Sequence, residues 1–139
     1  MFSNHQELRV VDLSRNEIEF VPEGLSKLPL LEILNLSYNH IRVLPECLSD
    51  LKALRQVDLS HNRIKAVGAQ FERMVGLATL DLTSNPELDV EHLPLRTRRL
   101  YEKVRRRKRK RRWRRQEQPQ ICSLTLLIVV TSQLQRCHS

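Results

Sequence analysis

Glycine, cysteine and aromatic residues are all scarce in this sequence of 139 residues. The three glycines, Gly24, Gly68 and Gly76, stand too far apart to form a loop that cradles phosphate. The three cysteines are 75 and 15 positions apart, and the five histidines show no metal-ligand spacing. We therefore expect no metal and no cofactor. Scattered thiols of this kind are typical of a reducing compartment.

The sequence also lacks a long apolar run. The N-terminus has no basic region followed by an apolar one, so we expect no secretory signal. Residues 121–131 are nearly all apolar, but about 20 such residues are needed to cross a bilayer. A membrane anchor with basic flanks is one alternative for this stretch, and an alternative or out-of-frame C-terminus is another. We expect no membrane association and an intracellular location, cytoplasmic, nuclear or both.

No catalytic set stands out either. Asp58 and His61 are three positions apart, and Ser60 lies between them. Ser60, however, belongs to a column of small hydroxyl residues that recurs every 23 positions, as Ser14, Ser37, Ser60 and Thr83. Such recurrence is typical of turn residues rather than of a nucleophile. We therefore expect that the protein is not an enzyme.

What the sequence does contain is one 23-residue pattern, which opens at Leu8, Leu31, Leu54 and Leu77. Three copies carry apolar residues at the same offsets around one asparagine. The first is Leu8, Val11, Leu13, Asn16, Ile18, Val21, Pro22, Leu25, Leu28; the second is Leu31, Leu34, Leu36, Asn39, Ile41, Leu44, Pro45, Leu48, Leu51; the third is Leu54, Val57, Leu59, Asn62, Ile64, Val67, Gly68, Phe71, Met74. The fourth keeps only Leu77, Leu80, Leu82 and Asn85 before the pattern ends. A fixed period of this length predicts stacked structural units, and about three suffice to bury a continuous core.

Spacing within one copy predicts its local structure. The alternation of Val11 and Leu13 has the period of a strand with one buried face, so each copy should add one strand to a parallel sheet. Leu25 and Leu28 are three apart, as in a helical or 3₁₀ turn packed on that sheet. An asparagine amide carries donors and an acceptor, so it can satisfy buried backbone groups in the turns. We predict this structural role for Asn16, Asn39, Asn62 and Asn85.

These copies resemble the leucine-rich repeat, L-x-x-L-x-L-x-x-N-x-L, in its 23-residue intracellular variety with "LP" after the asparagine. The resemblance covers roughly Leu8 to Val90. It implies an α/β solenoid: a short, curved array of four repeats with a parallel sheet on the concave face. It also implies a scaffolding or signal-transduction role through protein binding. The cysteines do not form the flanking clusters that cap extracellular members, which fits the intracellular expectation.

Charge divides the chain sharply. Residues 1–95 hold nine Lys/Arg and fourteen Asp/Glu, a net of −5, whereas residues 96–115 hold fourteen Lys/Arg and one Glu, a net of +13. We expect a short lead at 1–7, four repeats at 8–95, an irregular basic extension at 96–115 and a disordered tail at 116–139. Leu100, Tyr101 and Val104 have helical spacing and could cover the open end of the fourth repeat. Phe2 could cover the other end.

The basic segment has its highest charge density from residue 105 to residue 115. Like charges at this density repel, so an extended stretch or a frayed helix is expected. The segment suits either a nuclear localisation signal read by an import receptor or nonspecific phosphate binding on RNA or DNA. A solvated charge run with no partner is the third interpretation. The residues concerned are Arg105, Arg106, Arg107, Lys108, Arg109, Lys110, Arg111, Arg112 and Trp113.

The repeats themselves offer a surface, because strands line the concave side of a curved solenoid and their outward positions form columns. We predict a protein partner on this face. The columns are Val10, Ile33, Gln56, Thr79; Asp12, Asn35, Asp58, Asp81; Arg15, Tyr38, His61, Ser84; and Glu17, His40, Arg63, Pro86. Tyr38 and Arg15 are the favoured anchors, since aromatic and Arg side chains dominate interface hot spots.

Three functional interpretations follow. The first is a non-enzymatic protein-protein interaction module or adaptor that binds its partner on the concave face. The second is a nuclear or RNA/DNA-associated protein that acts through its basic segment. The third is a piece of a longer repeat array, because convincing polar caps are missing at both ends.

Overall fold

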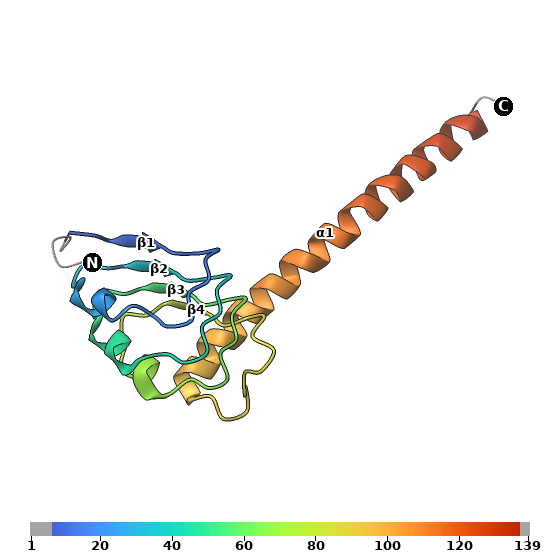
Figure 1. Cartoon of the computed structure of the whole chain (residues 1–139). Helices are drawn as coiled ribbons and strands as arrows, with labels where there is room; N and C mark the ends of the chain where they lie inside the picture. The colour runs from blue at the N-terminus through green and yellow to red at the C-terminus, as the bar shows by residue number, and fades with distance from the viewer. Residues whose placement is uncertain (1–6, 137–139) are drawn as a thin grey trace. The chain divides into compact units, whose positions relative to one another are not determined.

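The repeats form one parallel sheet in the computed structural model, which describes the backbone of residues 7–136 and the side chains of residues 7–115. The strands β1 (Val10–Asp12), β2 (Ile33–Asn35), β3 (Gln56–Asp58) and β4 (Thr79–Asp81) lie side by side in chain order (Figure 1). Ile33 pairs with Val10 on one side and with Gln56 on the other. Every pairing joins residues 23 positions apart, so each copy adds one strand without a shift in register.

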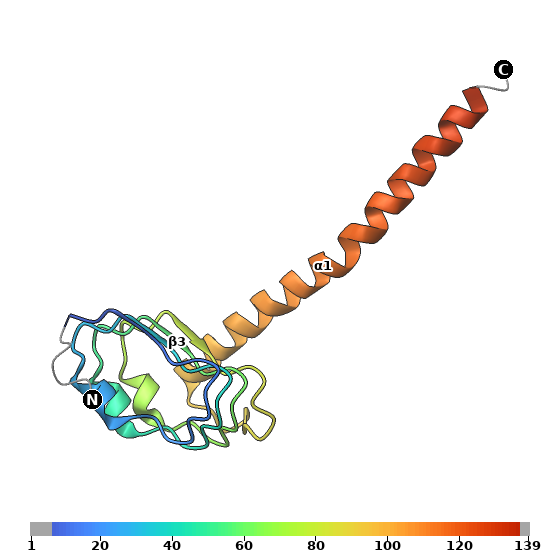
Figure 2. The same ribbon diagram turned by 45° about the horizontal axis from the view of Figure 1, so that its top comes forward.

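A short 3₁₀ helix completes each of the first three repeats. These are η1 (Glu23–Lys27), η2 (Glu46–Asp50) and η3 (Ala69–Glu72), and they lie across the core from the strands (Figure 2). Pro22 and Pro45 precede η1 and η2 with φ of −61° and −72°. The proline ring fixes φ near this value, which prepares the chain for the turn. Gly68 takes this place before η3, where an added Cβ would lie 2.6 Å from Oε1 of the buried Gln70.

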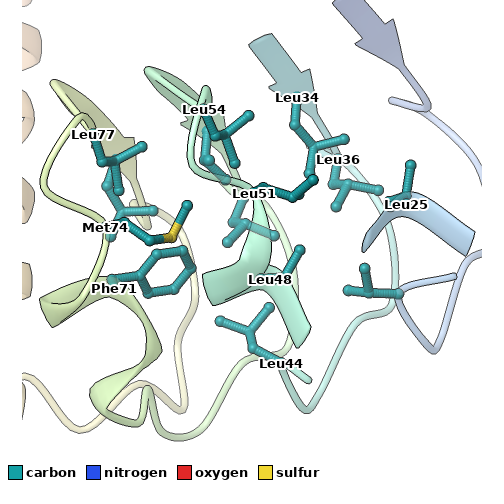
Figure 3. Close-up of a cluster of buried hydrophobic side chains, with 14 of the residues drawn as sticks. Leu25, Leu34, Leu36, Leu44, Leu48, Leu51, Leu54, Phe71, Met74 and Leu77 are labelled. Atoms are coloured by element: carbon teal, nitrogen blue, oxygen red, sulfur yellow. The ribbon is translucent and has the colours of Figure 1, made fainter. Parts of the chain in front are cut away.

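The core consists of the apolar residues that recur in every copy. Leucines from successive repeats point into one cluster, together with Phe71 and Met74 of the third repeat (Figure 3). Leu25, Leu48 and Phe71 occupy one repeat position and are almost fully buried. Burying a side chain of this size contributes about 1.5–3 kcal/mol. The predicted curved α/β solenoid of leucine-rich-repeat type is confirmed.

The first turns of α1 (Leu95–Arg136) close the fourth repeat. Leu93 and Val104 are buried, and Leu100 and Tyr101 pack against the core as partly buried side chains. The backbone N–H of the fully buried Thr97 donates to Oε1 of Glu72 at 2.9 Å, which satisfies one of the free donors at the start of a helix. The C-terminal cover predicted from Leu100, Tyr101 and Val104 is therefore present.

Residues 96–115, for which an irregular extension or a frayed helix was expected, are helical. The helical backbone of α1 continues to Arg136, and residues 137–139 lie outside the described residues. Two causes outweigh charge repulsion: Arg and Lys are good helix formers, and the docked first turns spare the rest of the helix the cost of nucleation. The chain divides into two compact units, residues 1–105 and 106–139. The proposed role of Phe2 lies outside the described residues.

Within the described part of the chain, no helix combines the length and the apolar character that crossing a membrane requires.

Candidate functional site

The first outward column of the sheet is formed by paired residues of adjacent strands. Val10, Ile33, Gln56 and Thr79 follow one another across the sheet. Val10 is 58% exposed and Ile33 is 36% exposed. Gln56 is also exposed, whereas Thr79 is half-buried. The column therefore begins with two exposed aliphatic side chains and becomes polar toward β4.

The second column, which ends each strand, has a structural task. Oδ1 of Asp12, Asn35 and Asp58 accepts the backbone N–H two residues later, at 2.9, 3.1 and 2.9 Å. Oδ1 of Asp81 does the same for Thr83 at 3.0 Å. The Ser14 hydroxyl and the Ser14 N–H hold the pKa of Asp12 below its usual range. These side chains close the turn after each strand, while Asp12 stays exposed and Asn35 and Asp58 are half-buried. Asp81 is buried.

The recurring asparagines link each turn to the one before it. Nδ2 of Asn39 donates to the carbonyls of Leu13, Leu36 and Ser37 at 3.0, 3.0 and 3.3 Å, and its Oδ1 accepts the N–H of Ile18 at 3.0 Å. Asn62 and Asn85 repeat the bonds to the preceding turn. Asn16 is exposed and donates only to Leu13 and Ser14 of its own turn. The asparagines thus act on the backbone, as the sequence predicts, with Asn16 the weakest of them.

The residue before each asparagine has a left-handed backbone, a feature that sequence reasoning missed. Arg15, Tyr38, His61 and Ser84 have φ of 57, 56, 56 and 59°. The N–H groups of Arg15, Tyr38 and His61 donate to carbonyls of the next repeat at 2.9, 3.0 and 3.0 Å. Each hydrogen bond links the residue with positive φ to the turn of the next repeat. Four different non-glycine residues hold this position, so the sequence carries no direct signal of the left-handed backbone.

This backbone places three of the predicted site residues in contact. The rings of Tyr38 and His61 stack with centroids 4.1 Å apart and an interplanar angle of 8°. The guanidinium carbon of Arg15 lies 5.3 Å from the centroid of the Tyr38 ring, within the range of a cation–π interaction. All three side chains are exposed. We call Arg15, Tyr38 and His61 the stacked column.

Cations of the second and third repeats lie near the carboxylate of Glu87. Nζ of Lys65 lies 2.8 Å from a carboxylate oxygen of Glu87. That hydrogen bond, with the charges of Lys65, Arg42 and Arg63, holds the pKa of Glu87 below its usual range. Arg63 was predicted as a partner-binding residue, whereas Arg42 and Lys65 were missed. The first repeat carries Glu17 and Glu19 at the positions that Arg63 and Lys65 occupy in the third, so the positive charge is confined to the second and third repeats.

An exposed apolar pair was also missed. Phe20 and Val43 form an isolated parallel bridge and are 75% and 65% exposed. They occupy one repeat position, directly before the apolar residue that precedes proline. The repeat pattern demands no particular residue there, so periodicity could not single them out.

The predicted nuclear-localisation or nucleic-acid residues lie on α1. The side chains from Arg105 to Trp113 are all exposed, and Trp113 is 60% exposed. Arg105 forms a 3.6 Å ion pair with Glu102. Four cations, Lys108, Arg111, Arg112 and Arg115, line a hollow of ≈ 240 Å³.

Among the described residues, no group of three or more His, Cys, Asp or Glu side chains could hold a metal ion. His92 and Asp89 lie 2.6 Å apart, but both are exposed in a turn. Burial, then the charges of Glu23 and Asp50, raise the pKa of Cys47, so its thiol is a poor nucleophile.

Comparisons with known proteins agree with the fold. A family model described as "Leucine rich repeat" matches residues 6–64. A solved structure of a leucine-rich repeat protein from Leptospira interrogans matches with a TM-score of 0.56 and 29% sequence identity. That match covers 72% of this chain, and the chain spans 23% of the length of that protein. No curated protein matches.

Proteins built on this fold are typically non-enzymatic and bind other proteins. The repeated 23-residue pattern, the parallel sheet with its asparagine-linked turns, and both matches point to one classification. Residues 6–64 match the leucine-rich repeat family, and the chain has the fold of a leucine-rich repeat protein.

Proposed function

We propose that this protein is a non-enzymatic interaction module that docks a partner protein on the strand face, with the stacked column as its anchor. The observation that supports this most is the stack of Tyr38 on His61. Long side chains lose rotamer entropy when a partner immobilises them, at about 0.5–1.5 kcal/mol each. Here the stack and the fixed backbone have already reduced that freedom, so the surface is preorganised.

The surroundings of the column also suit an interface. Val10 and Ile33 supply exposed apolar area on one side. Arg63, with Arg42 and Lys65, supplies positive charge on the other. An apolar patch beside aromatic and Arg side chains is the usual composition of a hot-spot region. We infer that the partner presents apolar groups toward β1 and β2 and acidic groups toward Arg63.

The test requires a variant that removes the rings without straining the backbone. Alanine is unsuitable, because residues 38 and 61 have positive φ, which asparagine tolerates better than other side chains. Affinity capture from cell lysate with Tyr38→Asn/His61→Asn should lose the partners that the unchanged protein retains. Loss of a buried Tyr anchor costs at least about 2 kcal/mol, which is about thirtyfold in affinity.

Two controls make the result decisive. Lys27→Ala/Lys52→Ala changes exposed side chains outside the strand face and should retain every partner. A variant with the cations of residues 106–115 replaced by Gln should also retain the partners of the strand face. If the asparagine double variant keeps all partners that the Gln variant loses, the function belongs to α1 and the proposal fails.

We also propose that the basic segment directs the protein to the nucleus. Support comes from the exposure of every described side chain from Arg105 to Arg115, which leaves them accessible to an import receptor. A fluorescent fusion of the whole chain should accumulate in the nucleus, and the Gln variant of residues 106–115 should not. Equal distribution of the two fusions would exclude this role.

A further inference from the structure

The helical state of the basic segment distributes its charge around an axis. Residues 106–115 consist of nine Lys/Arg and Trp113, and all of them are exposed on α1. Successive residues of an α-helix lie about 100° apart around its axis. Lys108, Arg111, Arg112 and Arg115 therefore share one side, where they line the hollow described above. Arg106, Arg109, Lys110 and Arg114 fall on the other side, around Trp113. No side of this stretch is uncharged.

Because cations lie on every side of the helix, the shape of an anionic partner decides how many of them it can contact. A flat surface, such as a membrane or the face of an acidic protein, contacts one side of a helix and gains nothing from cations on the other. A helix that lies on a membrane also needs an apolar face, and Trp113 alone does not provide one. A single strand requires a groove with several stacking platforms, whereas this helix is a convex rod with one aromatic ring. The distribution suits a partner that surrounds the helix.

The major groove of a B-form DNA duplex is such a partner. It is about 12 Å wide, and an α-helix with side chains is about 10–12 Å across. Phosphates line both walls of the groove, so cations on both sides of the helix find counter-charges. The major groove of A-form RNA is too deep and narrow for side chains to read.

The linear charge densities also match. At about 1.5 Å per residue, residues 106–115 extend about 15 Å. A DNA duplex carries one phosphate per about 1.7 Å of axis, which is about nine charges over that length. The helix offers nine cations over the same length. We propose that residues 106–115 bind duplex DNA as a helix in the major groove, through phosphate contacts that do not depend on sequence. This proposal is independent of partner docking on the strand face.

The experiment uses the full chain and a fluorescent DNA duplex of about two helical turns. Affinity should fall about a thousandfold or more between 50 and 200 mM salt, as it does for about six to ten phosphate contacts. The DNA duplex should bind more tightly than an RNA duplex of the same sequence, a single strand, phosphatidylserine vesicles or polyglutamate at equal salt. Tighter binding to any of these competitors would overturn the proposal.

Two quadruple variants test whether both sides of the helix contribute. One replaces Lys108, Arg111, Arg112 and Arg115 by Gln, and the other replaces Arg106, Arg109, Lys110 and Arg114. If the helix lies in a groove of the duplex, each variant should lower the slope of log affinity against log salt by about 3–4. If only one of the two variants loses slope, the partner surface is flat and groove binding is wrong.

A matched pair at Lys110 tests the helix itself. Lys110→Gln and Lys110→Pro remove the same charge, but only proline breaks the helix interior. The Gln variant should lower the salt slope by about 1. The Pro variant should in addition lose the preference for the DNA duplex over the single strand. If both variants keep that preference, the bound form is not this helix. Lys110 lies outside the repeat unit, so unchanged urea unfolding of the repeats serves as the folding control.

Discussion

The recurring asparagines differ in how many backbone groups depend on them. Asn39 is 5% exposed and makes four hydrogen bonds, two of which reach the preceding repeat. Asn16 occupies the same repeat position but is exposed and bonds only within its own turn. Water can replace the bonds of Asn16, whereas the groups around Asn39 have no such substitute. Burial, rather than recurrence, therefore decides the stabilising effect of each copy.

A matched pair of variants measures this difference. Asn39→Ala should lower the free energy of unfolding by about 1–3 kcal/mol, because it leaves buried backbone groups unpaired. Asn16→Ala should cost less, since its partners remain accessible to solvent. Urea unfolding of both variants is the measurement. Equal losses would show that the bonds to the preceding repeat contribute nothing.

The carboxylate of Glu87, in the turn after β4, gives the stability of the repeats a pH dependence. Lys65, then Arg42 and Arg63, lower its pKa from the ordinary 4.5. A carboxyl group with a lower pKa in the folded state stabilises the fold above the unfolded pKa and loses that contribution as the pH falls. In an NMR titration, Glu87 should titrate below pH 4.5, and Lys65→Gln should move its midpoint upward. An unchanged midpoint would show that Lys65 does not lower the pKa of Glu87.

The sequence predicts which residues face outward, but it does not predict how their backbones are arranged. Side-chain spacing indicates which positions face the core, and it indicated Arg15, Tyr38 and His61 as outward residues. It carries no direct information on the sign of φ, so the left-handed backbone that brings the three side chains into contact was not foreseen. Spacing likewise could not show that Asp81 is buried. Both features depend on contacts between neighbouring repeats.

At the scale of elements, α1 has two parts with different surroundings. Up to Arg105 it belongs to the repeat unit, where Thr97 and Val104 are buried. From Arg106 to Arg115 its side chains are exposed. The apolar spacing of Leu100, Tyr101 and Val104 predicted the first part. The charge of the second part predicted an extended stretch or a frayed helix, because like charges repel. A helix can nevertheless continue through a charged stretch once its first turns are fixed.

Truncation separates these two parts. A chain that ends at Leu95 loses Thr97, Leu100, Tyr101 and Val104, which cover the last repeat. Its free energy of unfolding should fall by roughly 2–5 kcal/mol, from the lost burial of these side chains. A chain that ends at Arg105 keeps them and should unfold at the same urea concentration as the full chain. If both chains retain full stability, the start of α1 does not cap the repeats.

At the scale of the whole molecule, two kinds of surface are encoded in separate parts of the sequence. The strand face arises from residues 23 positions apart, which only the folded repeats bring together. The cationic surface of α1 arises from consecutive residues and needs only a helix. The acidic charge of residues 1–95, a net of −5, also makes the repeats a poor ligand for nucleic acid. The two surfaces should therefore act on different partners.

Salt provides the measurement that distinguishes them. Protein docking on the stacked column buries rings and aliphatic groups and involves only the few cations around Arg63, so its affinity should fall far less between 50 and 200 mM salt than DNA binding does. DNA binding by α1 should weaken about a thousandfold or more over the same range. Tyr38→Asn/His61→Asn should weaken the first interaction and leave the second unchanged, and the Gln variant of residues 106–115 should do the reverse. If either variant impairs both interactions to the same extent while urea unfolding is unchanged, the two surfaces serve one partner.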